Sequence, residues 1–160
     1  LGDRFPELGA GFDRAGAVGM LVFGAPMLEQ VERRHGERAR SICLEALRAK
    51  VAEVADERLR TDFVVCLSEP GFDEVVVVIF RRPTSAGFYR TEMPGFRHEV
   101  GRALAADGAQ IFYPYLRGPS SLSVGLAVAL RNPQFGTATQ LRRLASILPP
   151  ACATARCISA

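Results

Sequence analysis

The sequence predicts one α+β domain in which a mainly antiparallel central sheet is flanked by helices. Residues 63–80 contain two apolar runs, FVVCL and VVVVIF, joined by the polar SEPGFDE, which is typical of a hairpin of buried strands. Residues 17–23 (AVGMLVF) form a third apolar run of strand length. In contrast, apolar residues recur at helical spacing across 27–54. Long apolar strands beside amphipathic helices favour a layered α+β fold.

In the first half of the chain, LGDRFPEL is expected to form a turn and then a helix. The first strand, 17–23, should stop at the Gly-Ala-Pro of 24–26. The apolar pattern of 27–54 is interrupted at 34–36, which predicts two successive helices before the hairpin.

In the second half, Gly and Pro residues predict a loop over 81–94. A helix is expected over 94–106, with Gly108 as its terminator. Residues 110–115 and 122–130 are then expected to form a pair of strands. A last helix over 137–148 should end at Pro149-Pro150.

The composition fits a single core. The chain has 160 residues, of which 48% are hydrophobic and 23% charged, so we expect one domain over 1–148 and a tail over 149–160. The net charge of +3 is scattered, without the basic stripe of nucleic-acid binders. No apolar run approaches the roughly 18 residues of a membrane span, and we expect no charged-then-apolar leader. We therefore expect a cytoplasmic domain taken from a longer protein, without nucleic acid or membrane span.

Four cysteines lack metal-site spacing. Cys43 and Cys66 fall within apolar-periodic elements, so they are expected to be small core residues. Cys152 and Cys157 fall in the tail. Unpaired cysteines of this kind agree with a reducing compartment.

Three segments resemble motifs of the GGDEF (diguanylate cyclase) domain family. Gly71, Phe72, Asp73, Glu74 and Val75 look like an eroded Gly-Gly-Asp-Glu-Phe signature. Near the start, Asp3 and Arg4 resemble the first two residues of the family's Asn-Arg-Arg-x-Phe motif. Residues 123–127 (SVGLA) are similar to its Ser-Ile-Gly-Val-Ala strand. The resemblance covers about 1–148 in the same order, and it implies the nucleotide-cyclase-like palm fold.

The family joins two GTP molecules into cyclic di-GMP in a head-to-head dimer. Such chemistry requires Mg²⁺ held by oxygen ligands. Aligning VERRHGERARSICL with the corresponding family segment puts Gly24, which has no side chain, at the position of a metal-binding Asp. The same register puts Glu32 at the guanine-reading Asn and Ser41 at a guanine-contacting Asp. Glu accepts hydrogen bonds but cannot donate as Asn does, so base recognition is expected to be damaged.

Other family features are also altered. Phe72 brings a bulky ring to a place where the family keeps the backbone close to phosphates. The family's phosphate-gripping Lys and Arg have no counterpart in LASILPPACATARC. Of the family's catalytic residues, only Asp73 and Glu74 remain. They are interpreted either as a residual metal-binding pair or as ordinary turn residues. We expect no catalytic residues, no metal site and no cofactor.

A second family property is cyclic di-GMP binding at an Arg-x-x-Asp motif before the signature. ERLRTDF offers Arg58, Arg60 and Asp62, at shifted spacing, and Arg81 and Arg82 could join them across the sheet. The alternative interpretation is a solvated charge cluster at a helix end.

These observations lead to a hypothesis of a degenerate, catalytically inactive GGDEF-like domain. It would serve as a regulatory or protein-interaction module, with a signalling or polarity protein as partner, in bacterial cyclic di-GMP signalling or cell polarity. One alternative is a receptor for cyclic di-GMP or GTP; another is an active diguanylate cyclase with substituted ligands. A homodimer is compatible with each.

Overall fold

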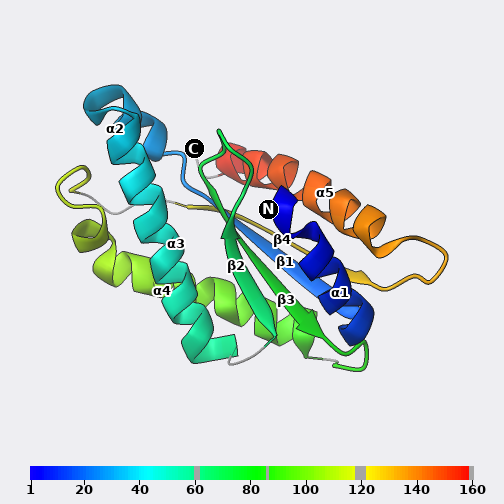
Figure 1. The fold of residues 1–160 in the computed structure, drawn as a ribbon. Helices are drawn as coiled ribbons and strands as arrows, with labels where there is room; N and C mark the ends of the chain where they lie inside the picture. Colours follow the sequence, from blue (N-terminus) through cyan, green and yellow to red (C-terminus); the bar gives the residue numbers. More distant parts are fainter. Residues whose placement is uncertain (60–61, 86, 118–121, 159–160) are drawn as a thin grey trace.

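The computed structural model of the chain describes residues 1–59, 62–85, 87–117 and 122–158, with side chains described up to Leu148. A four-stranded sheet of order β2-β3-β1-β4 forms the middle layer, and helices cover both of its faces (Figure 1). The strands are β1 (Ala17–Gly24), β2 (Phe63–Leu67), β3 (Glu74–Arg81) and β4 (Ser123–Leu130). Every strand pairing is antiparallel, as expected from the sequence.

The two central strands are apolar along their whole length because both of their faces are covered. Every residue of β1 is buried, and so is every residue of β3 except Arg81. On β3, Val75, Val77 and Ile79 face one core, whereas Val76 and Val78 face the other. This two-sided burial explains why these strands read as continuous apolar runs rather than as alternating ones.

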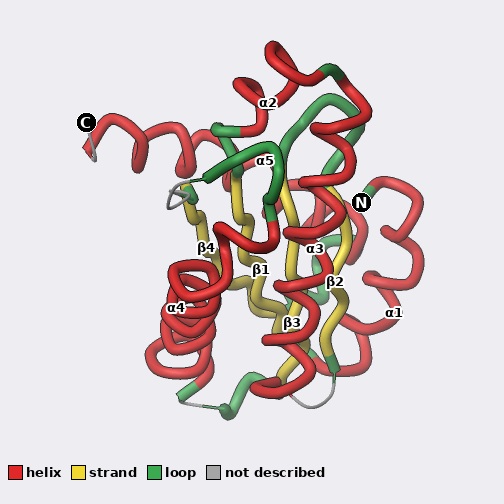
Figure 2. The backbone as a smooth tube through the Cα atoms, turned by 90° about the vertical axis from the view of Figure 1, so that its left-hand side faces the viewer, coloured by secondary structure: helices red, strands yellow, loops and turns green. Residues whose placement is uncertain are grey.

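The α-helices of the described residues cover both faces of the sheet, three on one and two on the other (Figures 1 and 2). The first face carries α2 (Leu28–His35), α3 (Glu37–Leu59) and α4 (Met93–Ile111). The second carries α1 (Phe5–Ala15), which follows the short helix η1 (Gly2–Arg4), and α5 (Thr137–Ile158). The break predicted at 34–36 is confirmed, because only Gly36 separates α2 from α3.

The predicted strand at 110–115 is wrong. Helix α4 continues to Ile111 and is followed by turns, so Gly108 lies inside the helix and does not end it. The buried positions Phe96, Val100, Leu104 and Gly108 keep a four-residue spacing that reaches the buried Phe112. A glycine within a helix costs only about 1 kcal/mol relative to Ala, which packing of this face can offset.

The loop expected over 81–94 is also more ordered than predicted. It contains η2 (Phe88–Glu92), a π-helical turn that leads directly into α4. The side chain of Arg81, at the end of β3, donates from Nε to the Glu92 carboxylate at 3.0 Å. This ion pair fixes the start of α4 against the sheet.

The predicted end of the last helix at Pro149-Pro150 is wrong as well, since α5 runs on to Ile158. Proline lacks an amide hydrogen and crowds the preceding turn, but its fixed φ is close to the helical value, so a helix can bend at proline without ending. The segment 149–160, expected as a separate tail, is therefore largely a continuation of α5.

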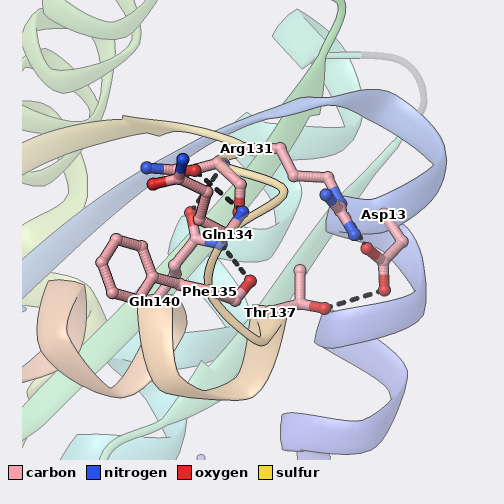
Figure 3. A network of polar contacts seen from close by, with 7 residues as sticks. Asp13, Arg131, Gln134, Phe135, Thr137 and Gln140 are labelled. Atoms are coloured by element: carbon pink, nitrogen blue, oxygen red, sulfur yellow. Dashed lines mark hydrogen bonds and ion pairs between the residues drawn. The ribbon is translucent and has the colours of Figure 1, made fainter.

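A group of polar contacts joins α1 to the connection between β4 and α5 (Figure 3). The Asp13 carboxylate accepts hydrogen bonds from the guanidinium of Arg131 and, at 2.8 Å, from the hydroxyl of Thr137. Gln140 donates from its amide to the backbone oxygens of Asn132 and Phe135, both at 2.9 Å. These contacts hold the start of α5 beside α1.

The cysteines that the structure describes behave as predicted. Cys43 and Cys66 are buried, and burial raises the pKa of both thiols. The side chains of Cys152 and Cys157 lie outside the described residues. Among the helices as far as they are described, none has the length and apolar character needed to cross a membrane.

Candidate functional site

The tip of the β2–β3 hairpin and the end of β1 meet at one end of the sheet. Gly24, the last residue of β1, lies directly opposite Glu74 of β3 on one side and Ser123 of β4 on the other. The amide of Ala25 donates to the backbone oxygen of Asp73 at 2.8 Å. Gly24, the signature and the start of the 123–127 motif therefore come together at this end, as antiparallel pairing of adjacent strands dictates.

The signature residues form a closed turn. The amide of Ser68 donates to the oxygen of Glu74 at 3.0 Å, and the amide of Phe72 donates to the oxygen of Glu69 at 3.2 Å. Gly71 has a φ of 94°, a conformation that favours glycine, which explains why this signature glycine is present. Phe72, which replaces the second glycine, exposes 52% of its surface at the tip.

A cation that the sequence reasoning missed lies against the signature. Arg40, near the start of α3, donates from Nε to Oδ1 of Asp73 at 2.6 Å, and its Nη1 lies 3.6 Å from the Glu32 carboxylate. The side chains of Arg40 and Asp73 are 17% and 18% exposed. The hydrogen bond with Asp73 raises the pKa of Arg40, so this guanidinium is charged at every physiological pH.

Arg40 and Asp73 line a hollow of about 310 Å³. Its other walls include Glu32, which was registered at the guanine-reading position, and the signature residues Gly71, Phe72 and Glu74. The positive charge of Arg40 already neutralises Asp73, and an ion pair of this kind competes with a metal ion for the same oxygen. Within the described residues, no group of three or more His, Cys, Asp and Glu side chains is placed to hold a metal ion.

The two surviving acids have different surroundings. Asp73 is held by Arg40, whereas Glu74 begins β3 and is 6% exposed. Among the described residues, none donates a hydrogen bond to the Glu74 carboxylate or forms an ion pair with it. The last signature residue, Val75, is fully buried in the core beneath α3 and α4. Neighbours in sequence leave a strand on opposite faces, which separates these environments.

The predicted cyclic di-GMP residues are spread over the ends of two elements. Arg58, near the end of α3, forms an ion pair with Glu99 of α4 at 3.1 Å. Asp62 immediately precedes β2 and has a φ of 59°. Arg60 lies outside the described residues. Arg81, which could join this group, binds Glu92 and also donates to the backbone oxygen of Leu59 at 3.5 Å, and Arg82 is exposed.

The sequence carried one signal that could have identified Arg40. In the same register that placed Gly24 and Glu32, Arg40 falls on a family glycine, one residue before Ser41. An arginine in place of a glycine, next to the expected guanine-contacting position, adds both a positive charge and a long side chain. Its partner could not be inferred without the fold, because Asp73 is 33 residues away in the chain.

Comparison with solved structures supports the same fold. The GGDEF domain of the PA2567 protein from Pseudomonas aeruginosa matches with a TM-score of 0.67 and 12% sequence identity over 98% of this chain and 88% of that one. The active GGEEF domain of a diguanylate cyclase from Vibrio cholerae matches with a TM-score of 0.59 and 12% identity, over 92% and 86%. The coiled coil and GGDEF domain of DgcB from Caulobacter crescentus, determined in complex with c-di-GMP, matches with a TM-score of 0.59 and 10% identity, over 91% and 70%.

No family model matches the chain, and no curated protein does. The likeness is therefore one of structure: the chain has a GGDEF-like fold at a sequence identity too low to carry activity with it.

Proposed function

We propose that this domain has no diguanylate cyclase activity and acts as a regulatory or protein-interaction module in a bacterial cyclic di-GMP signalling or polarity system. The observation that carries the proposal is the ion pair between Arg40 and Asp73 beside Gly24. The residue at the metal-ligand position has no side chain, and the signature carboxylate of Asp73 is bound by a cation of this chain.

The physical argument concerns charge. Joining two GTP molecules concentrates negative charge, and catalysis depends on divalent cations and donors that stabilise it. Mg²⁺ requires several oxygen ligands in near-octahedral geometry. Here one ligand position is Gly24, and the other, the acidic fourth residue of the signature, is Glu74. The adjacent Asp73 would have to release Arg40 before it could take part. A guanidinium can bind phosphate, but it cannot bind a carboxylate and the attacking hydroxyl together as a metal ion does.

The regulatory part of the proposal is supported by the preserved fold. The core is closed on both faces of the sheet, and backbone hydrogen bonds close the hairpin turn. A domain of this kind offers a stable surface, and the half-exposed Phe72 at the hairpin tip is an apolar contact point on it.

A cyclic di-GMP receptor is the second candidate, because the similar DgcB structure contains c-di-GMP. Arg58, Arg60 and Asp62 would supply its contacts. Arg58 is half exposed and paired with Glu99, so ligand phosphate or guanine would have to displace that carboxylate.

Calorimetric titration separates these functions. We expect no heat of binding from GTP with Mg²⁺ and none from cyclic di-GMP. Saturable binding of cyclic di-GMP that is lost in Arg60→Ala would establish a receptor. Binding of GTP that requires Mg²⁺ would contradict the proposal that the metal site is lost.

A further inference from the structure

A second hollow lies beside the hairpin tip and is lined by residues from the start of the chain and from α5. It has a volume of about 360 Å³. Its walls include the side chains of Leu1, Phe5, Phe72, Glu74, Arg142 and Ser146. This hollow faces α1 and α5, whereas Arg40 lies on α3, which covers the opposite face of the sheet.

Glu74 lines this hollow as well as the one beside Arg40, and its carboxylate lacks a partner in the described part of the chain. Glu74 precedes Val76 and Val78 at two-residue spacing, so its side chain leaves β3 on the same face, toward α1 and α5. Only 6% of the surface of Glu74 is exposed to solvent. Burying a carboxylate without a donor is costly, which indicates that a donor is supplied by something outside the described residues.

The surroundings of Glu74 define the chemistry of that donor. A carboxylate only accepts, and it matches the paired donors of a guanidinium best. Phe5 and Phe72 provide two aromatic rings, on which a guanidinium packs well. Arg142 already lies with its guanidinium carbon 5.9 Å from the centroid of the Phe5 ring. Glu69 also lines the hollow, so its charged side chains are two carboxylates and one guanidinium, while the ammonium of Leu1 donates to the backbone oxygen of Leu67 at 3.0 Å.

We propose that this hollow receives an arginine side chain of a protein partner, whose guanidinium is held by Glu74 and packs against Phe72. The proposal rests on the protein-interaction function proposed above and specifies the chemistry of the partner. The aliphatic part of the arginine would cover Leu1 and Phe5, and the half-exposed Phe72 would become buried on docking.

The test is a titration of the isotope-labelled chain with N-acetyl-arginine amide, followed by NMR. The citrulline derivative is the matched probe, because it has the same shape without the charge. We expect saturable shifts at the amides of Phe5, Phe72 and Ser146 with the arginine probe and much weaker ones with the citrulline probe. Equal shifts with both probes, or none with either, would overturn the proposal.

Two variants make the test specific. Glu74→Gln should weaken binding of the arginine probe by about tenfold or more, because it removes the charge from the hydrogen bond. Glu57→Gln makes the same change at an exposed position of α3, on the opposite face, and should leave the affinity unchanged. Equal affinities in the wild type and Glu74→Gln would contradict the assignment of Glu74.

Stability provides an independent readout. If the Glu74 carboxylate is unpaired in the free chain, Glu74→Gln should leave the midpoint of thermal unfolding unchanged or raise it. A lower midpoint would show that the folded chain itself supplies a partner for Glu74, and would overturn the proposal.

The outcome is separable from that of the proposed function. If the chain makes no product from GTP and does not bind the arginine probe, only the proposal that the hollow binds arginine fails. If Mg²⁺ with GTP, rather than the arginine probe, shifts the Phe72 and Ser146 amides, both proposals fail.

Discussion

Single residues decide what this fold can do chemically. The sequence of the hairpin tip shows two adjacent acids, but the structure gives them separate roles: Asp73 is neutralised by Arg40, and Glu74 is buried toward α5. The sequence predicts that Gly24 supplies no side-chain ligand to a metal, and that prediction needs only the absence of a side chain. The ion pair with Arg40 could not be predicted, because it depends on how α3 lies against the hairpin.

The Arg40–Asp73 pair should contribute to stability. Arg40→Ala leaves the part-buried Asp73 carboxylate without its donor, so the free energy of unfolding should fall by about 1–3 kcal/mol. Arg33→Ala, which removes an exposed pair with Glu29, is the control and should change it by about 0.5 kcal/mol or less. Chemical denaturation of the three proteins measures both, and equal effects would argue against a structural role for Arg40.

Asp13 should titrate below the ordinary range. The hydrogen bond from Arg131, followed by that from Thr137, lowers the pKa of Asp13 in the folded chain. Since the folded pKa is below the unfolded one, the stabilisation is present above the unfolded pKa of about 4 and is lost as pH falls through the folded pKa. NMR titration of the carboxyl carbon should show this low value in the wild type.

In the variant Arg131→Ala, the pKa of Asp13 should rise toward its ordinary value. An unchanged pKa in this variant would mean that the contact of Figure 3 is not maintained in solution.

At the scale of elements, the pattern of apolar residues predicted helices and strands correctly where burial is regular. It gave wrong helix bounds where Gly or Pro interrupts the pattern. The buried runs of β1 and β3 and the four-residue spacing of α3 could be read directly. Gly108 and Pro149-Pro150 were misleading because both residue types usually end helices, whereas here they lie within α4 and α5. Packing of a continuous apolar face outweighed the local preference in α4.

The contact between α4 and β1 depends on a glycine. A methyl group on Gly19 would lie 2.4 Å from the sulfur of Met93 and 2.6 Å from Cζ of Phe88. Gly19→Ala should therefore destabilise the domain by about 1–3 kcal/mol through overpacking. Gly101→Ala, at an exposed position of α4 with open space around it, should instead stabilise it by about 0.5–1 kcal/mol. Thermal or chemical unfolding of both variants checks the signs; destabilisation by both would indicate that helix propensity and packing have been misjudged here.

For the whole molecule, the fold depends less on particular residues than the family's reaction does. A GGDEF-like arrangement survives at 12% identity to its structural neighbours, because a sheet covered on both faces needs apolar pattern and strand order more than particular residues. The nucleotide-joining reaction has no such tolerance, since it needs specific oxygens around divalent cations. The sequence could therefore predict the fold from short motifs in the right order. The loss of ligands stays a prediction, and the use to which the remaining surface is put could not be predicted.

The decisive measurement is the incubation of the chain at high concentration with GTP and Mg²⁺, with cyclic di-GMP quantified by chromatography. We predict no product above that of a protein-free control, both in the wild type and in Arg40→Ala, because Gly24 still supplies no ligand. Cyclic di-GMP accumulating in proportion to the wild-type protein, and abolished by Asp73→Asn or Glu74→Gln, would contradict the proposed loss of activity.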